Sequence, residues 1–440
     1  MSFETSTKIT KAAGTIFAAA LLSMTGAAAA ATDAQAQQLE QKIDALSQQL
    51  EALKAQLQQL KSQNEALAAQ QEQQAQQQAA AAAAPRASAM DNVSLWGYGE
   101  VYYDRPIHDT EKTTADLARA VFGIGYRFDE RTRFNSEFEV EHAVSSAADP
   151  GEFEVEQLYV DRQLTNWASV KGGLMLIPSG LINLSHEPTH FYGVQRNFVE
   201  TLIIPSTWRE GGFAFHGDTD FGLAWDAGLT TGFDLSKWDV TTKPEDLEDT
   251  APLQATHQEL ALANAAHVSQ YLALGYNGVP GLNVGASVFT GVAKPVQNNI
   301  SDQRVTLWEA HTRWTPGPFD LSALYARGII SNSGAINNLY PGAANPLPGA
   351  FFGYYLQGAA NVWQQGDYRL APFVRWERYN TGAGFNGVAP GYAQRNPTER
   401  VWSYGANFYV TPHVVVKADY QSFELSRDME RIDLGLGLDF

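Results

Sequence analysis

The feature that most constrains the fold is a series of segments, each about ten residues long, in which apolar and polar residues alternate from Val93 to Phe440. A period of two residues indicates β-strands with one apolar and one polar face. The C-terminal stretch RIDLGLGLDF is the clearest case, because every second residue from Ile432 to Phe440 is apolar and those between are Asp or Gly. The chain after residue 92 is therefore expected to be all-β.

The number of segments and the lengths of their connections narrow the fold class further. Sixteen strands are predicted, at 93–104, 115–128, 132–144, 152–164, 168–177, 207–217, 221–234, 267–278, 281–294, 304–315, 318–331, 350–363, 368–380, 399–411, 413–426 and 431–440. Tight turns such as DER and VPG alternate with long loops such as 178–206 and 235–266. Short turns at one end and long loops at the other are typical of outer-membrane barrels. In hydrocarbon every backbone polar group must be paired, so strands can span a membrane only as a closed barrel. The pattern predicts a 16-stranded antiparallel transmembrane β-barrel over 93–440.

The residues before the barrel indicate export and oligomerisation. Lys8 and Lys11, a short apolar run and an Ala-rich stretch predict a signal peptide over 1–31. A coiled coil is predicted over 32–67, and residues 68–92 are a Gln/Ala-rich flexible linker. The heptad has apolar or register-setting side chains at Leu39, Ile43, Leu46, Leu50, Leu53, Leu57, Leu60, Asn64 and Leu67. Both barrel ends fall on the short-turn side, which predicts a periplasmic coil.

Composition excludes several classes of protein. The chain has no cysteine, so it has neither disulfides nor thiolate metal sites. No apolar run reaches the roughly 18–20 residues of a transmembrane helix. A formal net charge of −18 argues against a nucleic-acid partner, because an acidic chain repels phosphates.

One motif points to a different chemistry. His186-Glu187-Pro188-Thr189-His190 matches H-E-x-x-H, in which two histidines on one helix bind zinc. Pro188 disfavours the helix that this geometry needs, and Arg196 stands where the longer motif has its third histidine. Zinc hydrolysis is a remote alternative, and the prediction is that the protein is not an enzyme and has no metal or cofactor.

Charged residues that strand parity and loop position direct into the lumen are the candidates for the solute pathway. They are Arg119, Arg127, Arg133, Lys171, His186, His190, Arg196, Glu200, Arg313, Arg375 and Lys417. Charges in a low-dielectric constriction focus the field and select permeant ions. Each also has a structural alternative; for example, Arg196 and Glu200 are spaced to pair and brace the loop. Acidic residues share the inward face, at Glu137, Glu139, Glu141, Glu309, Glu377, Asp419 and Asp433. The alternation slips near EVEQLYVDR, which predicts a β-bulge there.

Together these features resemble a Gram-negative porin over residues 93–440. The stretch GLINLSHEPTHFYGVQRNFVETLIIPSTWREGG, within residues 171–212, resembles the phosphate-selective porin O and P family. The coil before the barrel is similar to that of porins related to the dicarboxylic-acid channels. The resemblance implies a homotrimer, a third loop folded inward to narrow each pore, and assembly guided by the terminal Phe440.

The leading hypothesis is therefore an outer-membrane porin in the lipid of the Gram-negative envelope. Small hydrophilic solutes, predominantly phosphate- or carboxylate-type anions, would diffuse through it, and the third loop would form the constriction. The alternative is an envelope-spacing protein that contacts peptidoglycan through its coil.

Overall fold

The computed structural model describes residues 40, 42–63, 89–146, 151–244, 247–293, 301–389, 392 and 397–440. The predicted signal peptide and the heptad positions Leu39, Asn64 and Leu67 lie outside these residues, as does most of the predicted linker. The chain divides into two units, residues 1–87 and 88–440. None of the described helices is both long and apolar enough to cross a membrane.

In the first unit, residues 42–63 form a helix. The predicted heptad residues on it are exposed, with fractions between 51% at Leu50 and 67% at Leu57. They lie at a and d positions, so they form one apolar stripe along the helix. The helix is present as predicted, and its association with other copies stays a prediction.

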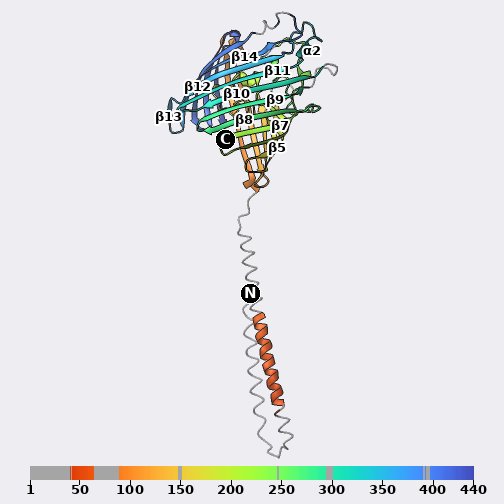
Figure 1. Ribbon diagram of the computed structural model, residues 1–440. Helices are drawn as coiled ribbons and strands as arrows, with labels where there is room; N and C mark the ends of the chain where they lie inside the picture. The colour runs from red at the N-terminus through yellow and green to blue at the C-terminus, as the bar shows by residue number, and fades with distance from the viewer. Residues whose placement is uncertain are drawn as a thin grey trace, which may run out of the picture. The chain divides into compact units, whose positions relative to one another are not determined.

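The second unit begins with a short 3-10 helix, η1 (Ala89–Asn92), and continues into the strands of one closed sheet. Their bounds are β1 (Val93–Pro106), β2 (Thr114–Arg127), β3 (Thr132–Glu141), β4 (Phe153–Gln163), β5 (Ser169–Leu176), β6 (Arg209–Asp218), β7 (Leu223–Thr230), β8 (Ser269–Val279), β9 (Leu282–Ala293), β10 (Gln303–Trp314), β11 (Phe319–Ile330), β12 (Ala350–Ala360), β13 (Trp363–Gln365), β14 (Tyr368–Gly384), β15 (Glu399–Thr411), β16 (Val414–Phe423) and β17 (Arg431–Asp439). Consecutive strands pair antiparallel, except that β12 and β13 both pair with β14, and β17 pairs with β1. Figure 1 shows the strands from β7 to β12 side by side in the barrel wall.

The predicted count of sixteen barrel strands is confirmed, although the structure divides the twelfth. β12 ends at Ala360, and the three-residue β13 continues the same hairpin against β14. The barrel closes where the backbone N–H of Phe440 donates to the carbonyl of Gly97, at 2.9 Å. Closure leaves no sheet edge unpaired, as the hydrocarbon core of a membrane requires.

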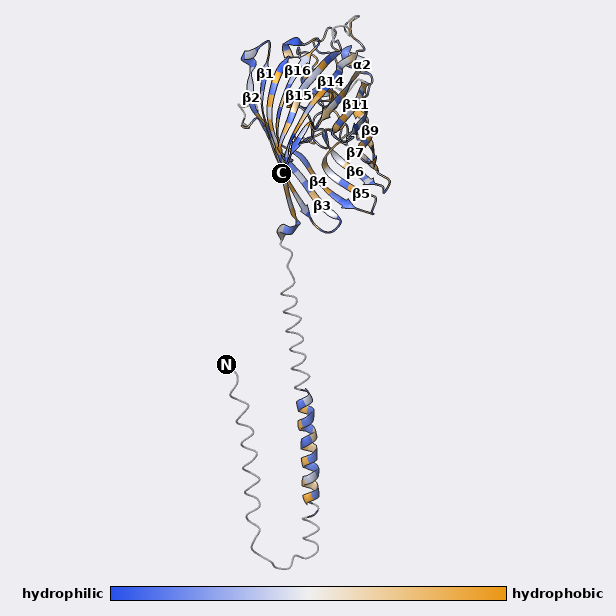
Figure 2. Ribbon diagram, turned by 90° about the vertical axis from the view of Figure 1, so that its left-hand side faces the viewer, coloured by the Kyte–Doolittle hydropathy of each residue, from blue (hydrophilic) through white to orange (hydrophobic). Residues whose placement is uncertain are grey.

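The outer and inner faces of the barrel differ as the alternation predicts. On β17, Ile432 and Leu434 are 44% and 49% exposed on the outer face, whereas Asp433 between them is fully buried in the lumen. Figure 2 shows the resulting mixture of apolar and polar residues along the strands. An apolar outer belt around a closed barrel places the protein in an outer membrane. Trp96 lies near a strand end, where aromatic residues often form an interfacial girdle, but its indole N–H donates to Glu137 in the lumen.

The predicted bulge is also confirmed. Glu137 pairs with Gln157 and Phe138 pairs with Val155, so Glu156 is the extra residue on β4. A bulge breaks strict alternation and re-aims side chains. It directs Glu156 and Gln157 to the same, lumenal side of the sheet, where Gln157 donates to Glu137.

Three long loops at one end of the barrel fold into the lumen and pack together. They are residues 177–208, residues 231–244 with 247–268, and residues 331–349, the last containing α2 (Ser333–Asn337), which lies at the loop end of the barrel (Figure 1). Their buried apolar side chains form one core with lumenal residues of β5, β6, β8–β12 and β14–β16. Trp208 is central, with its ring 4.7 Å from that of Phe289 on β9 and 5.4 Å from that of Phe233. The lumen along these strands is thus filled by an apolar core at the loop end.

Candidate functional site

Residues 177–208, here called the third loop, cross the lumen and are held on its far side by the barrel wall. The backbone N–H of Val194 donates to Asp419 at 2.6 Å, and Asn407 donates to the carbonyl of Phe191 at 3.0 Å. Arg375 donates to the carbonyl of Tyr192 at 3.0 Å. Side chains of β14, β15 and β16 thus replace water as partners for the loop backbone, as burial of polar groups requires.

Glycines on the wall allow this close approach. A Cβ at Gly437 would lie 2.5 Å from Cβ of Pro188, and one at Gly435 would lie 3.0 Å from Cγ1 of Val194. Both glycines lie on the lumenal face of β17. The glycines in RIDLGLGLDF therefore have a structural role, because the absence of a side chain leaves the space in which the third loop lies.

Glu200 braces the third loop from within. One carboxylate oxygen accepts from the N–H groups of Leu181 and Ile182 at 2.5 and 2.8 Å. The other accepts from Asn197 and from the hydroxyl of Tyr355 on β12, both at 2.9 Å. The described contacts of Glu200 are to the loop itself and to β12, and its side chain is buried, which is the arrangement of a brace. Glu200 does not form the ion pair with Arg196 that their spacing of four residues in the sequence allowed.

The HEPTH segment forms a turn and not a helix. The N–H of His190 donates to the carbonyl of Glu187 at 2.9 Å, with Pro188 at the second position of the turn, where its fixed φ fits. The two histidines have different surroundings. His186 is buried, and this burial, with the nearby Arg196, lowers its pKa to about 4. His190 is 46% exposed and contacts Glu187 at 2.9 Å. The geometry that the zinc-protease motif needs is therefore absent.

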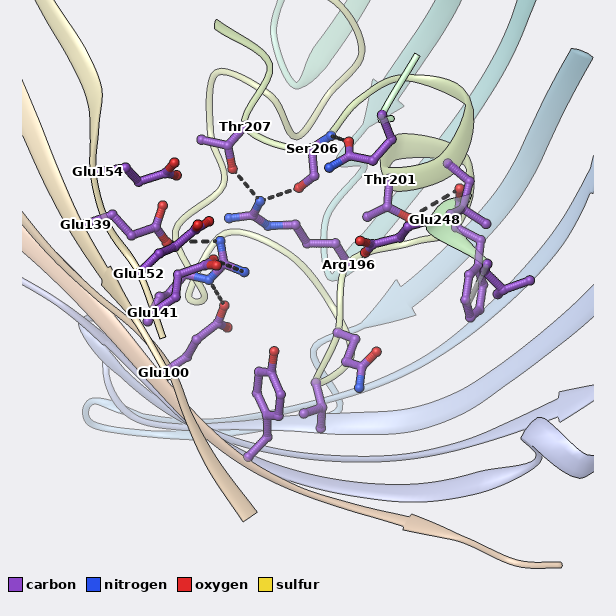
Figure 3. A pocket seen from close by; sticks show the side chains of 18 of the residues that line it. Glu100, Glu139, Glu141, Glu152, Glu154, Arg196, Thr201, Ser206, Thr207 and Glu248 are labelled. Atoms are coloured by element: carbon purple, nitrogen blue, oxygen red, sulfur yellow. Dashed lines mark hydrogen bonds and ion pairs between the residues drawn. The ribbon is translucent and has the colours of Figure 1, made fainter. Parts of the chain in front are cut away.

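Between the third loop and the wall made by β1–β4 lies a cavity of about 620 Å³. Glutamates of the wall, Glu100, Glu139, Glu141, Glu152 and Glu154, face Arg196 on the loop across it (Figure 3). Seven glutamates and four arginines line the cavity in all, the others including Glu248, Glu259, Arg209 and Arg431. This polar cavity therefore lies on the side of the lumen that the apolar core does not occupy.

Arg119 lies among the glutamates of the cavity wall and contacts three of them. Its guanidinium lies 2.9 Å from Glu100, 3.3 Å from Glu139 and 3.6 Å from Glu141. One cation shared among three carboxylates leaves the cluster with a surplus of negative charge. Arg196, on the opposite side, donates to the hydroxyls of Ser206 and Thr207 and has no carboxylate within ion-pair distance among the described residues. A guanidinium and an acidic wall thus face each other across the cavity.

The other predicted pathway residues lie elsewhere in the lumen. Lys171 pairs with Asp226 at 2.6 Å, and Arg313 forms a two-pronged contact with Asp320 at 3.0 and 2.6 Å. Arg375 is buried against Glu377 at 2.8 Å. Lys417 is buried with its ammonium 3.6 Å from the ring centre of Phe191. Arg127 and Arg133 are exposed at the turn end of the barrel. Of the predicted set, the structure brings only Arg119 and Arg196 together at the large cavity.

Several residues of the cavity were not among the predicted site residues. Glu100, Glu152, Glu154, Arg209 and Glu259 come from three strands and two loops. Strand parity was a usable signal for Glu100, which pairs with Arg119 across β1 and β2. No local pattern marked Glu259, because its contact with Arg209 at 3.0 Å depends on the fold of a loop fifty residues away.

The fold and its inward third loop define a porin-type barrel, and comparisons with known proteins agree. OmpF of Salmonella typhi, in a complex with daunomycin, is similar with a TM-score of 0.51 and 12% identity over 79% of this chain and 98% of that one. The outer-membrane channel DcaP of Acinetobacter baumannii has a TM-score of 0.50 and 12% identity over 79% and 97%. An anion-selective porin from Comamonas acidovorans has a TM-score of 0.50 and 12% identity over 79% and 99%. At these identities the likeness establishes the fold alone.

The sequence itself has a nearer relative. The chain belongs to the same family as a protein of Aquifex aeolicus (strain VF5) described as uncharacterized, with 30% identity over 355 residues, 77% of this chain and 78% of that protein. No protein-family model matches the chain.

Proposed function

We propose that the protein is a channel through which small hydrophilic solutes diffuse passively across the outer membrane. The observation that carries this proposal is the polar cavity between the third loop and the β1–β4 wall. Charged groups at a narrow, low-dielectric passage select ions by their field. The third loop would then set the width of the passage and Arg196 would face the solute.

The lining favours cations over the phosphate- or carboxylate-type anions that the sequence resemblance implied. Lys171, Arg313 and Arg375 each have a carboxylate partner, so they present little unpaired positive charge to the lumen. The cavity itself has seven glutamates against four arginines. A net negative lining raises the local concentration of cations and repels anions. The function proposed is thus a porin with a preference for small cations.

Planar-bilayer recording of the purified protein in a salt gradient tests both parts of this proposal. A reversal potential of the cation-selective sign is expected, and an anion-selective one would overturn the ion preference. Complete absence of conductance would overturn the channel. Phosphate and dicarboxylates added as blockers are expected to have weak effects.

A matched pair of variants connects selectivity with the cavity. Glu152 and Glu248 line it and are exposed, so Glu152→Gln with Glu248→Gln removes charge at little cost to the fold. Cation preference is expected to fall in this double variant. Glu130→Gln, in the exposed turn between β2 and β3, is the control and should leave the reversal potential unchanged.

We further propose that the protein is a homotrimer, as the resemblance to porins implies. The apolar stripe on the helix 42–63 supports self-association of the chain. Cross-linking of the protein in native membranes, followed by electrophoresis, gives the number of chains directly.

A further inference from the structure

Three side chains from three different elements converge in the lumen beside the third loop. They are Glu137 on β3, Glu156 at the bulge of β4 and His186 on the loop, and one ligand atom from each lies within 4.8 Å of the others. The imidazole Nε2 of His186 lies 3.8 Å from a carboxylate oxygen of Glu156. None of the three lines the large cavity, but Glu156 lies beside Glu139, which does, so the cluster adjoins the acidic lining of that cavity.

The orientation of His186 is set by a backbone group. Its Nδ1 lies 3.1 Å from the carbonyl oxygen of Asn183. A carbonyl oxygen can only accept, so Nδ1 carries the hydrogen and Nε2 presents its lone pair to the two glutamates. An imidazole lone pair and carboxylate oxygens repel one another unless an electrophile lies between them.

Glu156 is a fully buried carboxylate with no strong cationic partner. Among the described residues no lysine or arginine lies within 4.0 Å of its oxygens or of those of Glu137. The hydroxyl of Tyr98 reaches Glu156 only at 3.3 and 3.4 Å. Buried carboxylates in proteins are paired with a cation, neutralised by a proton or coordinated to a metal. Among the described residues, Glu156 and Glu137 have no such cation from a lysine or arginine.

Groups outside the cluster orient each of its three members, two of them as donors and the carbonyl of Asn183 as an acceptor. Trp96 donates to Glu137 at 2.6 Å, Tyr98 lies next to Glu156, and Asn183 holds His186. Such outer partners fix the orientation of metal ligands and are a regular feature of metal sites. A carboxylate has about four lone-pair positions, so both glutamates keep capacity for a further bond.

We propose that Glu137, Glu156 and His186 bind one divalent transition-metal ion of the Zn²⁺ type. One imidazole nitrogen and two carboxylate oxygens suit Zn²⁺ and its neighbours in the first transition row, and three protein ligands leave a position for water. The ion would neutralise the buried carboxylates. It would also connect the third loop to β3 and β4, so the loop would be anchored on this side of the lumen by metal and on the far side by Asp419 and Asn407.

Zinc binding by the full-length protein tests the proposal. The protein in detergent is treated with a chelator, dialysed against Zn²⁺, and analysed for bound metal and for the midpoint of thermal unfolding. One strongly bound equivalent is expected for the wild type, with a higher midpoint, because a ligand that binds only the folded state stabilises it. His186→Gln and Glu156→Gln are expected to weaken this binding by more than about 100-fold, the upper range for losing only an outer partner of a metal ligand.

His190→Gln is the matched control, since it removes the exposed histidine of the same segment. It should keep the strongly bound equivalent. Folded wild-type protein that binds no Zn²⁺ would overturn the proposal and would assign neutralisation of Glu156 to a proton. Equal binding by folded wild type and His186→Gln would overturn it as well. If His186→Gln does not fold, Zn²⁺ binding by Glu137→Gln and the number of Zn²⁺ ions bound by the wild type still test the proposal.

Discussion

Gly437 on β17 lies directly against Pro188 of the third loop, so that a Cβ at position 437 would be only 2.5 Å from the proline Cβ. The contact joins two residues that are far apart in the sequence. It also explains why a strand otherwise rich in leucine has glycine on its lumenal face. A side chain at this position cannot coexist with the loop in its present place.

We therefore expect Gly437→Val to displace the third loop from the wall. Forcing extra carbons into a packed site costs about 1–3 kcal/mol, enough to shift the loop without unfolding a large barrel. Single-channel conductance should change and its noise should rise. Gly275→Ala on β8 is the control, because a Cβ there would meet only Ala224 at 3.9 Å. Equal conductance and noise for Gly437→Val and the wild type would contradict the packing argument.

Substitution of the brace at Glu200 should loosen the same loop. Glu200→Gln replaces one of two accepting oxygens by a donor that must face an N–H or O–H group. Hydrogen bonds to a charged group are worth about 1.5–3 kcal/mol each, so a substantial loss of stability is expected. Limited proteolysis of the loop and the midpoint of urea unfolding measure it. Tyr355→Phe removes only the contact from β12 and should have a smaller effect. The same protease resistance in Glu200→Gln and wild type would exclude a bracing role.

The stability of the protein should depend on pH through His190. A hydrogen bond with Glu187 raises the pKa of His190, although partial burial opposes this. The protonated imidazole therefore stabilises the fold. This contribution is complete below the ordinary pKa of 6.5 and is lost as the pH rises through the raised value in the folded protein.

Because the pair is partly exposed, we expect about 0.2–1 kcal/mol from it. The difference in urea midpoint between wild type and His190→Gln should be larger at pH 5.5 than at pH 8. His267→Gln, an exposed histidine before β8, is the control. If the difference in urea midpoint between wild type and His190→Gln were larger at pH 8 than at pH 5.5, protonation of His190 would not stabilise the fold.

The apolar stripe of the helix 42–63 predicts where chains meet. The protein has no cysteine, so single cysteines report contacts without background. Leu53→Cys, on the stripe, should give covalent dimers on oxidation in the native membrane. Gln48→Cys lies on the opposite face of the helix and should give few. Equal cross-linking by the two variants would exclude a specific coil, and the apolar stripe would then be open to a partner in the envelope such as peptidoglycan.

Much of the barrel follows from local patterns. The sequence predicted the strands from the period of two in segments such as RIDLGLGLDF, and it predicted their number and the alternation of turn and loop lengths. Each of these features depends on residues that are neighbours in sequence. The bulge at Glu156 was visible too, as a slip of the same period. The direction of Trp96 did not follow from its place near a strand end, because an indole N–H there finds a partner in a lumen as well as at a membrane interface.

The polar cavity between the third loop and the wall depends on tertiary structure. Its geometry arises from contacts such as Val194 with Asp419 and Phe191 with Asn407, more than two hundred residues apart in sequence. Parity shows that a side chain faces the lumen, but only the packing of three loops shows which part of the lumen stays open. The sequence alone thus determined a sixteen-stranded barrel and its lipid-facing surface. The fold of the loops decided where glutamate, arginine and histidine meet, because burial and electrostatic pairing are properties of the assembled lumen and not of any one strand.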